Sequence, residues 1–217
     1  MAPRRYVMTR KKELAAETRQ RILVATLKLH GRYGIFGTSW KEIAQEASVA
    51  VGTVYKYFPT LDQLVPACGE LLMERVRPPQ PESIISIIGD ATEPTDRLYR
   101  VALELFAFYE RGGRHLDIDS RERELPAVQE WESHLHNLVR GFVDEAVASC
   151  GLNDEAIAKL AYLFDFPTFR AMRARGLSAT DAASIATEMA IAWIGARQFG
   201  SPGSKSMAAS GRNSKKQ

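Results

Sequence analysis

Residues 39–58, SWKEIAQEASVAVGTVYKYF, combine hydroxyl groups, cations and two short sets of apolar residues. The apolar residues recur at helical spacing in two groups, Ile43, Ala44 and Ala47, then Val54 and Phe58. Ser39 and Glu42 form a capping-box pattern at the start of the first group. Two short helices joined by a tight turn, the second exposing hydroxyls and a lysine, are typical of a helix-turn-helix that enters a DNA groove.

Ten residues of this stretch are candidates for contact with DNA: Ser39, Trp40, Lys41, Ala50, Val51, Gly52, Thr53, Tyr55, Lys56 and Tyr57. Hydrogen-bond donors for phosphates or base edges are carried by Thr53, Tyr55, Lys56 and Tyr57. Ala50 and Val51 suit contact with thymine methyl groups, or they only fill the turn. Trp40 is either a DNA contact or a core residue.

The charge is unevenly divided along the chain, although the net charge is only +3. Residues 1–58 hold eleven Lys and Arg against four Asp and Glu, whereas residues 59–199 hold fourteen against twenty-two. A basic N-terminal part on an acidic body is expected when only one end meets phosphate. Residues 1–12 are predicted to be a basic flexible arm, whose cations reach DNA or are simply solvated.

At 217 residues the chain is long enough for one large or two modest domains. It has no run of about 20 apolar residues and no secretory signal. Cys68 and Cys150 are too few and too distant for a disulfide framework or a metal site. These features predict a cytoplasmic protein with no membrane partner, metal or cofactor. No phosphate loop, nucleophile elbow or paired-carboxylate motif indicates an enzyme.

The periodicity predicts an all-α fold of about nine helices with no strand. A helix over 13–33 precedes the helix-turn-helix and completes a three-helix head, residues 13–60. Residues 61–199 are expected to form a helical bundle for ligand binding and dimerisation. The Ser-, Gly- and Lys-rich tail, 200–217, is predicted to be disordered.

Polar residues at the predicted helix starts are candidate N-caps: Thr60 with Gln63, Asn153, and Ser178. Pro66 removes the amide that would bond to the carbonyl of Asp62, so a kink or a loose first turn is expected there. Pro167 is expected to break the helix that Asn153 begins.

Two features of the predicted bundle indicate partners. The final helix carries small residues at helical spacing, which permit the close helix approach of a dimer interface: Ala183, Ala186, Ala190 and Gly195. Aromatic and polar groups on the middle helices are candidates for a small-molecule pocket, or for ordinary core packing: Tyr99, Phe106, Tyr109, Trp131, His134, Leu138 and Phe142.

Around the helix-turn-helix the chain resembles the TetR family of bacterial transcriptional regulators. The resemblance rests on RILVATLKLH, GTSWKEIAQEA, SVAVGTVYKYF and LDQLV, which span about residues 17–66 without a gap. The stretch LFDFPTFRAMRARGLSATDAASIATEMA is similar to the last two helices of many members. Three residues depart from the family pattern: Ser48 replaces the turn glycine, Ala50 the turn serine, and Leu61 the lysine that often begins the fourth helix.

The resemblance implies a homodimer formed through the last two helices, about residues 154–199, and an inducer pocket in the bundle. It also implies that Lys41 reaches a base or a phosphate, and that Ser39 and Trp40 lie at the end that contacts the DNA backbone. At Ser48, a side chain is expected in a backbone conformation that suits glycine better.

These observations predict a homodimeric repressor of a palindromic operator in double-stranded DNA, with heads about 34 Å apart, released by a small-molecule effector. The alternative is a DNA-binding regulator without a small-molecule ligand, acting as an activator or controlled by a partner. A cavity in the bundle distinguishes the two, because its absence would favour the alternative.

Overall fold

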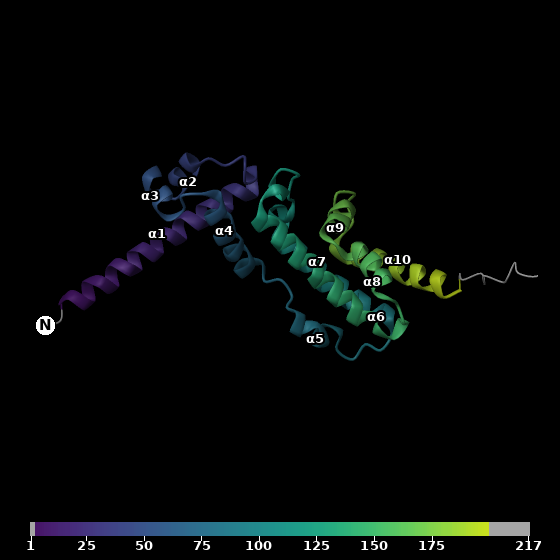
Figure 1. The fold of residues 1–217 in the computed structure, drawn as a ribbon. Helices are drawn as coiled ribbons and strands as arrows, with labels where there is room; N and C mark the ends of the chain where they lie inside the picture. The colour runs from purple at the N-terminus through teal and green to yellow at the C-terminus, as the bar shows by residue number, and fades with distance from the viewer. Residues whose placement is uncertain (1–2, 200–217) are drawn as a thin grey trace, which may run out of the picture.

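The computed structural model describes residues 3–199, which form a helical head and a helical body (Figure 1). The head contains α1 (Pro3–Tyr33), α2 (Trp40–Glu46), α3 (Val51–Tyr57) and the start of α4 (Leu61–Val76). The body contains α5 (Ile84–Ile88), α6 (Pro94–Gly112), α7 (Pro126–Ala146), α8 (Asp154–Ala161), α9 (Phe166–Arg173) and α10 (Ala179–Phe199). The predicted all-α class is confirmed; ten α-helices lie in this range, and no strand does. The predicted disordered tail, 200–217, lies outside the described residues.

The two short helices of the head depend on a core that α1 and α4 supply. α2 and α3 have seven residues each, too few to be stable alone in water. Their buried side chains are Ile43 and Ala44 from α2, and Val54 from α3 with Phe58 directly after it. They pack with apolar residues of α1 and with four residues of α4: Leu64, Ala67, Cys68 and Leu71. The head core therefore continues past the predicted boundary at residue 60, into α4 as far as Leu71.

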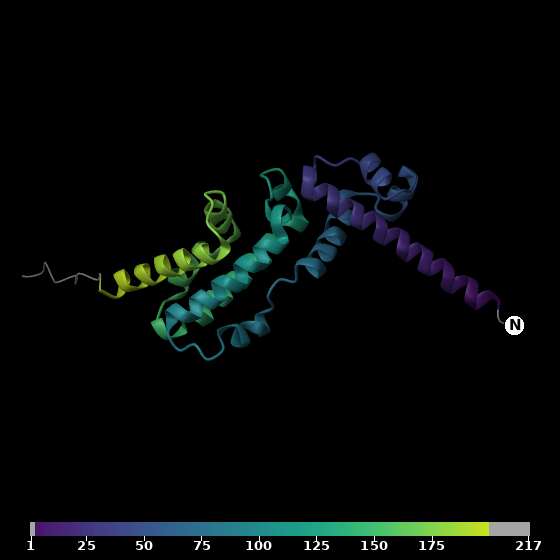
Figure 2. The ribbon, with the colours of Figure 1, turned by 180° about the vertical axis from the view of Figure 1, so that it is seen from behind.

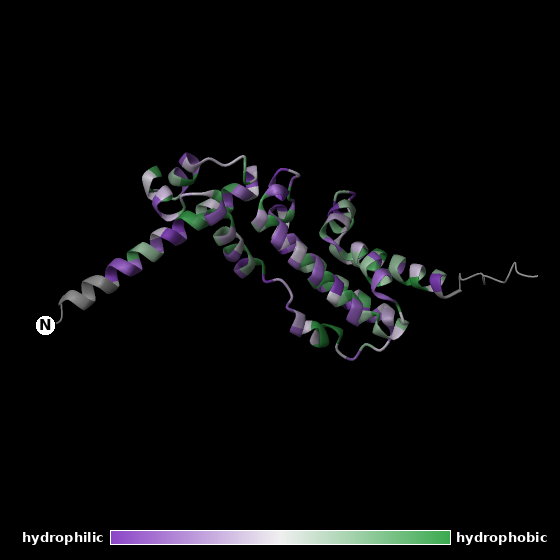
Figure 3. Ribbon diagram, in the orientation of Figure 1, coloured by the Kyte–Doolittle hydropathy of each residue, from purple (hydrophilic) through white to green (hydrophobic). Residues whose placement is uncertain are grey.

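α1 extends well beyond the head, as both views show (Figures 1 and 2). Its 31 residues include positions 3–12, so the helix begins ten residues earlier than the predicted start at residue 13. Between Pro3 and Gly31 the sequence contains no glycine or further proline, so nothing interrupts the helix there. Pro3 itself occupies a first-turn position that proline tolerates. The coloured part of α1 outside the head is mainly hydrophilic (Figure 3). Arg10, Lys11 and Lys12 are exposed.

α4 connects the head to the body and continues as a helix through Pro66. Thr60 occupies the N-cap position but makes no side-chain capping bond, unlike the prediction. At the other end the guanidinium of Arg111 on α6 donates to the carbonyl oxygens of Val76, at 2.8 Å, and Arg77, at 3.1 Å. The body thus binds the carbonyl end of the helix that carries the head.

The core of the body is built mainly by α6, α7 and α10. The apolar face of α6 is fully buried, with Leu98, Val101 and Leu105 all 0% exposed. α10 packs most extensively against this face. Ala183, Ala186 and Ala190 are also 0% exposed within the protomer. The prediction that they face a second copy was therefore wrong, because small residues permit close approach of any helix, and α6 takes that place.

The second half of the body shows which local signals determine the helix ends. Oδ1 of Asn153 accepts from the backbone N–H of Ala156 at 2.9 Å, as predicted for an N-cap. Oγ of Ser178 accepts from the N–H of Asp181 at 3.0 Å, so the predicted cap of α10 is confirmed. The chain between Asn153 and α9 breaks after Ala161 into a 3-10 turn, and Pro167 lies in the first turn of α9.

None of the helices described between residues 3 and 199 is long and apolar enough to span a membrane.

We expect Leu64→Ala to lower the free energy of unfolding by about 2–5 kcal/mol, because Leu64 is 0% exposed in the head core. The exposed neighbour Gln63 provides the control: Gln63→Ala should change stability by less than about 0.5 kcal/mol. Urea denaturation followed by circular dichroism measures both. Equal losses for the two variants would show that α4 does not contribute to the head core.

Candidate nucleic-acid interface and interdomain cavity

The first helix of the helix-turn-helix begins with a complete capping box. The backbone N–H of Glu42 donates to Oγ of Ser39 at 3.2 Å, and the backbone N–H of Ser39 donates to Oε2 of Glu42 at 2.8 Å. The hydroxyl of Ser39 donates to the same carboxylate oxygen at 2.6 Å, and these bonds from Ser39 lower the pKa of Glu42. The predicted cap is confirmed. Since Glu42 accepts the hydroxyl proton, a bond from Ser39 to phosphate requires that proton to change partners.

The turn between the helices places Ser48 in the left-handed region, with φ +55°. The N–H of Val49 donates to the carbonyl of Ala44 at 3.0 Å, and the N–H of Ser48 donates to that of Gln45 at 3.1 Å. These are the two bonds of a Schellman motif, whose left-handed residue is usually glycine. The expectation that Ser48 occupies a conformation better suited to glycine is confirmed.

The second helix of the motif buries one side and exposes the other. Val54 is 0% and Phe58 2% exposed, and the Arg19 guanidinium of α1 lies 5.2 Å from the centre of the Phe58 ring. On the opposite side Tyr55 is 46% exposed. A Cβ added to Gly52 would meet nothing within 4 Å, so this glycine leaves the start of α3 open to a close approach. The outward side of α3 is thus shaped to meet a large partner.

Trp40 and Tyr55 join the two helices on the outer surface. Their ring centres lie 5.1 Å apart with an interplanar angle of 32°, a favourable arrangement for an aromatic pair. Trp40 is half-buried and also packs against the head core. Trp40 is therefore a core residue that also supports the exposed ring of Tyr55.

The positive charges on this surface are available to an anionic partner. Lys41 and Lys56 are exposed, and neither forms an ion pair with any residue whose side chain is described. In contrast, Lys28 of α1 is paired with Glu46 at the end of α2. Lys41 and Lys56 can therefore bind phosphate without first losing a protein partner.

The structure brings the ten predicted DNA-contact residues to one part of the head, and none of them is buried. Seven are exposed: Ser39, Lys41, Ala50, Val51, Gly52, Tyr55 and Lys56. The other three, Trp40, Thr53 and Tyr57, are half-buried. Of these, Trp40 and Tyr57 pack against the head core and present only part of their side chains to solvent.

A cavity of about 980 Å³ lies between the head and the body. Its walls come from the end of α1, the middle of α4, the connection between α6 and α7, and the start of α7. Nε2 of His30 is buried at this wall and has no hydrogen-bond partner among the residues that the structure describes. Burial, with a smaller effect from nearby His115, lowers the pKa of His30 to about 4. The imidazole is therefore neutral at neutral pH and can donate to or accept from a bound molecule.

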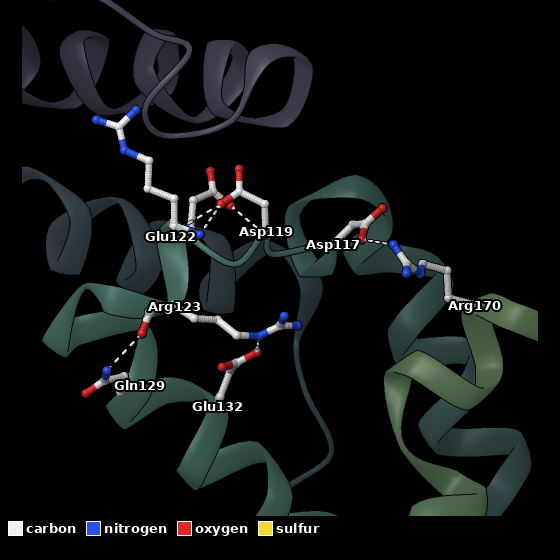
Figure 4. A network of polar contacts seen from close by, with 8 residues as sticks. Asp117, Asp119, Glu122, Arg123, Gln129, Glu132 and Arg170 are labelled. Atoms are coloured by element: carbon white, nitrogen blue, oxygen red, sulfur yellow. Dashed lines mark hydrogen bonds and ion pairs between the residues drawn. The ribbon is translucent and has the colours of Figure 1, made fainter.

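The connection between α6 and α7, residues 113–125, fastens the head to the body. The ring Nε2 of His115 lies 2.9 Å from the carbonyl oxygen of Leu27 on α1. Oε1 of Glu122 accepts from the backbone N–H of Ile35, just after α1, at 2.5 Å. Figure 4 shows Glu122 pointing toward the ribbon of the head. Both bonds are made by residues that line the cavity.

Neighbouring charges hold residues 113–125 in place (Figure 4). Oδ1 of Asp119 accepts from the backbone N–H groups of Arg121 and Glu122, each at 2.8 Å. Arg123 pairs with Glu132 on α7. The Arg121 guanidinium lies 4.0 Å from the centre of the Phe36 ring, which adds a further contact with the head. The position of the α1–α2 loop therefore depends on the conformation of this connection.

The structure separates the seven predicted pocket residues into two groups. Trp131 and His134 line the cavity, and the indole N–H of Trp131 points to the sulfur of Met73 at 3.4 Å. The other five do not line it: Tyr99, Phe106, Tyr109, Leu138 and Phe142. Apart from the half-buried Tyr99, these five are buried in the body core. Tyr109 is an example of such a core residue. Its hydroxyl donates to the carbonyl of Phe164 at 3.0 Å, and burial raises the pKa of this hydroxyl well above its usual value.

Sequence reasoning missed the residues that connect the head with the cavity, above all His30, His115 and Glu122. No periodicity or motif marks them, and the polar connection 113–125 gave no helical signal. Within the part of the chain that the structure describes, no group of three or more His, Cys, Asp or Glu residues is arranged to hold a metal ion.

Comparison with known proteins concerns mainly the head. Residues 22–68 match the family described as bacterial regulatory proteins, tetR family. The HTH-type transcriptional repressor KstR of Mycolicibacterium smegmatis is 43% identical over 58 residues, and KstR of Rhodococcus jostii is 40% identical over 60 residues. These alignments cover 26% and 28% of this chain, and the chain spans only 28% of the length of each relative.

The fold of most of the chain is similar to that of solved regulators. One is NalD, the secondary repressor of the MexAB-OprM multidrug efflux pump in Pseudomonas aeruginosa, with a TM-score of 0.59 and 22% identity over 83% of this chain and 96% of that one. Another is a TetR transcription regulator from Haloarcula marismortui, with a TM-score of 0.57 and 20% identity over 83% and 98%. At this level of identity the likeness shows the fold alone.

We expect Ser48→Gly to raise the free energy of unfolding by about 0.5–1 kcal/mol, because glycine adopts positive φ without the cost of a Cβ. Ser48→Ala is the matched control, since it removes the hydroxyl but keeps the Cβ, and it should give no gain. Urea denaturation measures both changes. A gain of equal size in the two variants would mean that the hydroxyl, not the backbone conformation, is unfavourable.

Proposed function

We propose that this chain is a regulator of the TetR family and acts as a homodimeric repressor of a palindromic DNA operator, released by a small-molecule effector. The observation that carries the proposal is the outer side of α2 and α3, where two lysines form no ion pair with any described side chain and the exposed ring of Tyr55 lies on the same short helix as the open Gly52. A short helix with free donors and cations on a rigid support suits the major groove. The site of action would be the bacterial cytoplasm, where the DNA lies.

The cavity between head and body supports the ligand-responsive form of this proposal over a regulator without an effector. Its volume of about 980 Å³ is at the upper end of the range of small-molecule pockets. Two of the segments that wall it, the end of α1 and residues 113–125, are hydrogen-bonded to each other through Glu122 and Ile35. A molecule that binds between them better in one head position than in another would change the affinity for DNA.

Repression requires two heads to meet one operator, and the outward face of α10 is the proposed dimer surface. Met189 is 49% exposed on α10, and Ala192 and Ala196 are exposed at the following turns. Tyr162, 59% exposed, follows α8 directly. The proposed face thus differs from the alanine stripe, which α6 covers.

We expect the full chain to bind a palindromic fragment from the region beside its own gene at about 150 mM salt, where non-specific affinity is only about 10⁻⁴–10⁻⁶ M. Lys56→Ala should weaken binding to all sequences alike and reduce the salt slope by about 1. Tyr55→Phe, which retains the ring beside Trp40, should change the preference among operators if the hydroxyl reads a base. Fluorescence anisotropy with competitor DNA measures these effects. The proposal fails if no fragment competes with bulk DNA.

Met189→Glu should convert the dimer to a monomer and weaken operator binding at least about tenfold, because it buries an unpaired charge in the interface. Ile85→Glu is the matched control: Ile85 on α5 is 66% exposed and lies outside the proposed face. Analytical ultracentrifugation reports the association state. A dimer that survives Met189→Glu and dissociates with Ile85→Glu would place the interface elsewhere.

A further inference from the structure

Glu122 is the only Asp, Glu, Lys or Arg that is buried among the side chains described, residues 10–197. Its side chain is 5% exposed and lines the cavity. The carboxylate accepts from two backbone N–H groups, those of Ile35 at 2.5 Å and Asp119 at 3.2 Å. It forms no ion pair within the described range. A buried anion with only neutral donors is costly, and a cation placed beside it would be strongly favoured.

The remaining lining charges also favour a cation. Six carboxylates line the cavity, against two guanidinium groups. Three of the six are Glu70 and Glu74 on α4 and Glu130 on α7, which form no ion pair with the residues described. The guanidinium groups belong to Arg32 and Arg114, which are both exposed. An anionic ligand would therefore meet a net negative wall.

The apolar part of the lining determines the rest of the ligand. It includes Leu27, Val65, Leu72, Met73, Ile118 and Trp131. Apolar walls with a few polar groups bind a molecule that has an apolar body. The half-buried indole of Trp131 adds an aromatic surface of the kind that attracts cations.

We infer that the effector is an organic cation with an apolar body, whose positive group lies beside Glu122. This inference rests on the proposed function for the role of effector, although binding itself requires no DNA. A cation at Glu122 competes with the N–H of Ile35 for the carboxylate. The cation thereby weakens the hydrogen bond that positions the loop leading into α2. The head is then less tightly fixed to the body when the cavity is occupied.

The test uses two probes of equal size and opposite charge, tetraphenylphosphonium and tetraphenylborate, with the full chain and no DNA. Isothermal titration calorimetry should show one tetraphenylphosphonium site per chain and at least about tenfold weaker binding of tetraphenylborate. Glu122→Gln keeps an acceptor for Ile35 but removes the charge, and it should weaken tetraphenylphosphonium binding at least about tenfold. Glu130→Gln, at the exposed wall, should change it less than about threefold, because solvent screens that charge.

Thermal unfolding of each variant shows whether it still folds. Glu122→Asp retains the charge, so this variant should still bind tetraphenylphosphonium more tightly than tetraphenylborate. Equal affinity for the two probes overturns the inference, and so does wild-type affinity in Glu122→Gln or a lack of binding by either probe. Operator binding is measured separately. Its failure would reject the proposed repressor and leave the calorimetric result standing, whereas loss of cation binding would leave operator binding unaffected.

Discussion

The packing of α2 and α3 against α1 and α4 is the constraint on which the other properties of this molecule depend. Each of the two helices has seven residues, and neither could persist without a partner. Ile43 and Val54 lie at the centre of this packing, at 2% and 0% exposure. Because one side of α3 is buried so completely, its other side faces solvent in a fixed orientation. The short helix can therefore present that side to a DNA groove.

The same packing makes the head sensitive to the body. α4 contributes residues as far as Leu71 to the head core, and its end is bound by Arg111 of α6. Residues 113–125 form a second connection, through His115 and Glu122. Residues of both connections, α4 and 113–125, line the cavity. A change at the cavity can therefore reach the head through bonded and packed elements.

The body shows how one sequence signal can serve two structural purposes. A stripe of small residues predicts that a helix comes close, and Ala183, Ala186 and Ala190 do lie against a helix. That helix is α6 of the same chain, because its apolar face is wide and must be covered. Similarly, aromatic residues such as Phe106 and Phe142 were candidates for a pocket or for ordinary core packing, and in the structure they belong to the core. Periodicity reports that a face is buried but not what buries it.

The sequence alone determined the head, since its signals are local: the Ser39–Glu42 capping box, the apolar spacing of two short helices, and Ser48 at a glycine position. Each depends on residues a few positions apart, and hydrogen bonds within the turn express them directly. Only the tertiary structure decided where the cavity lies and which residues join it to the head. Glu122 and Ile35 are 87 positions apart. Nothing in either neighbourhood reveals that a buried carboxylate will meet a backbone N–H, because that contact exists only when α4, α6 and α7 have assembled.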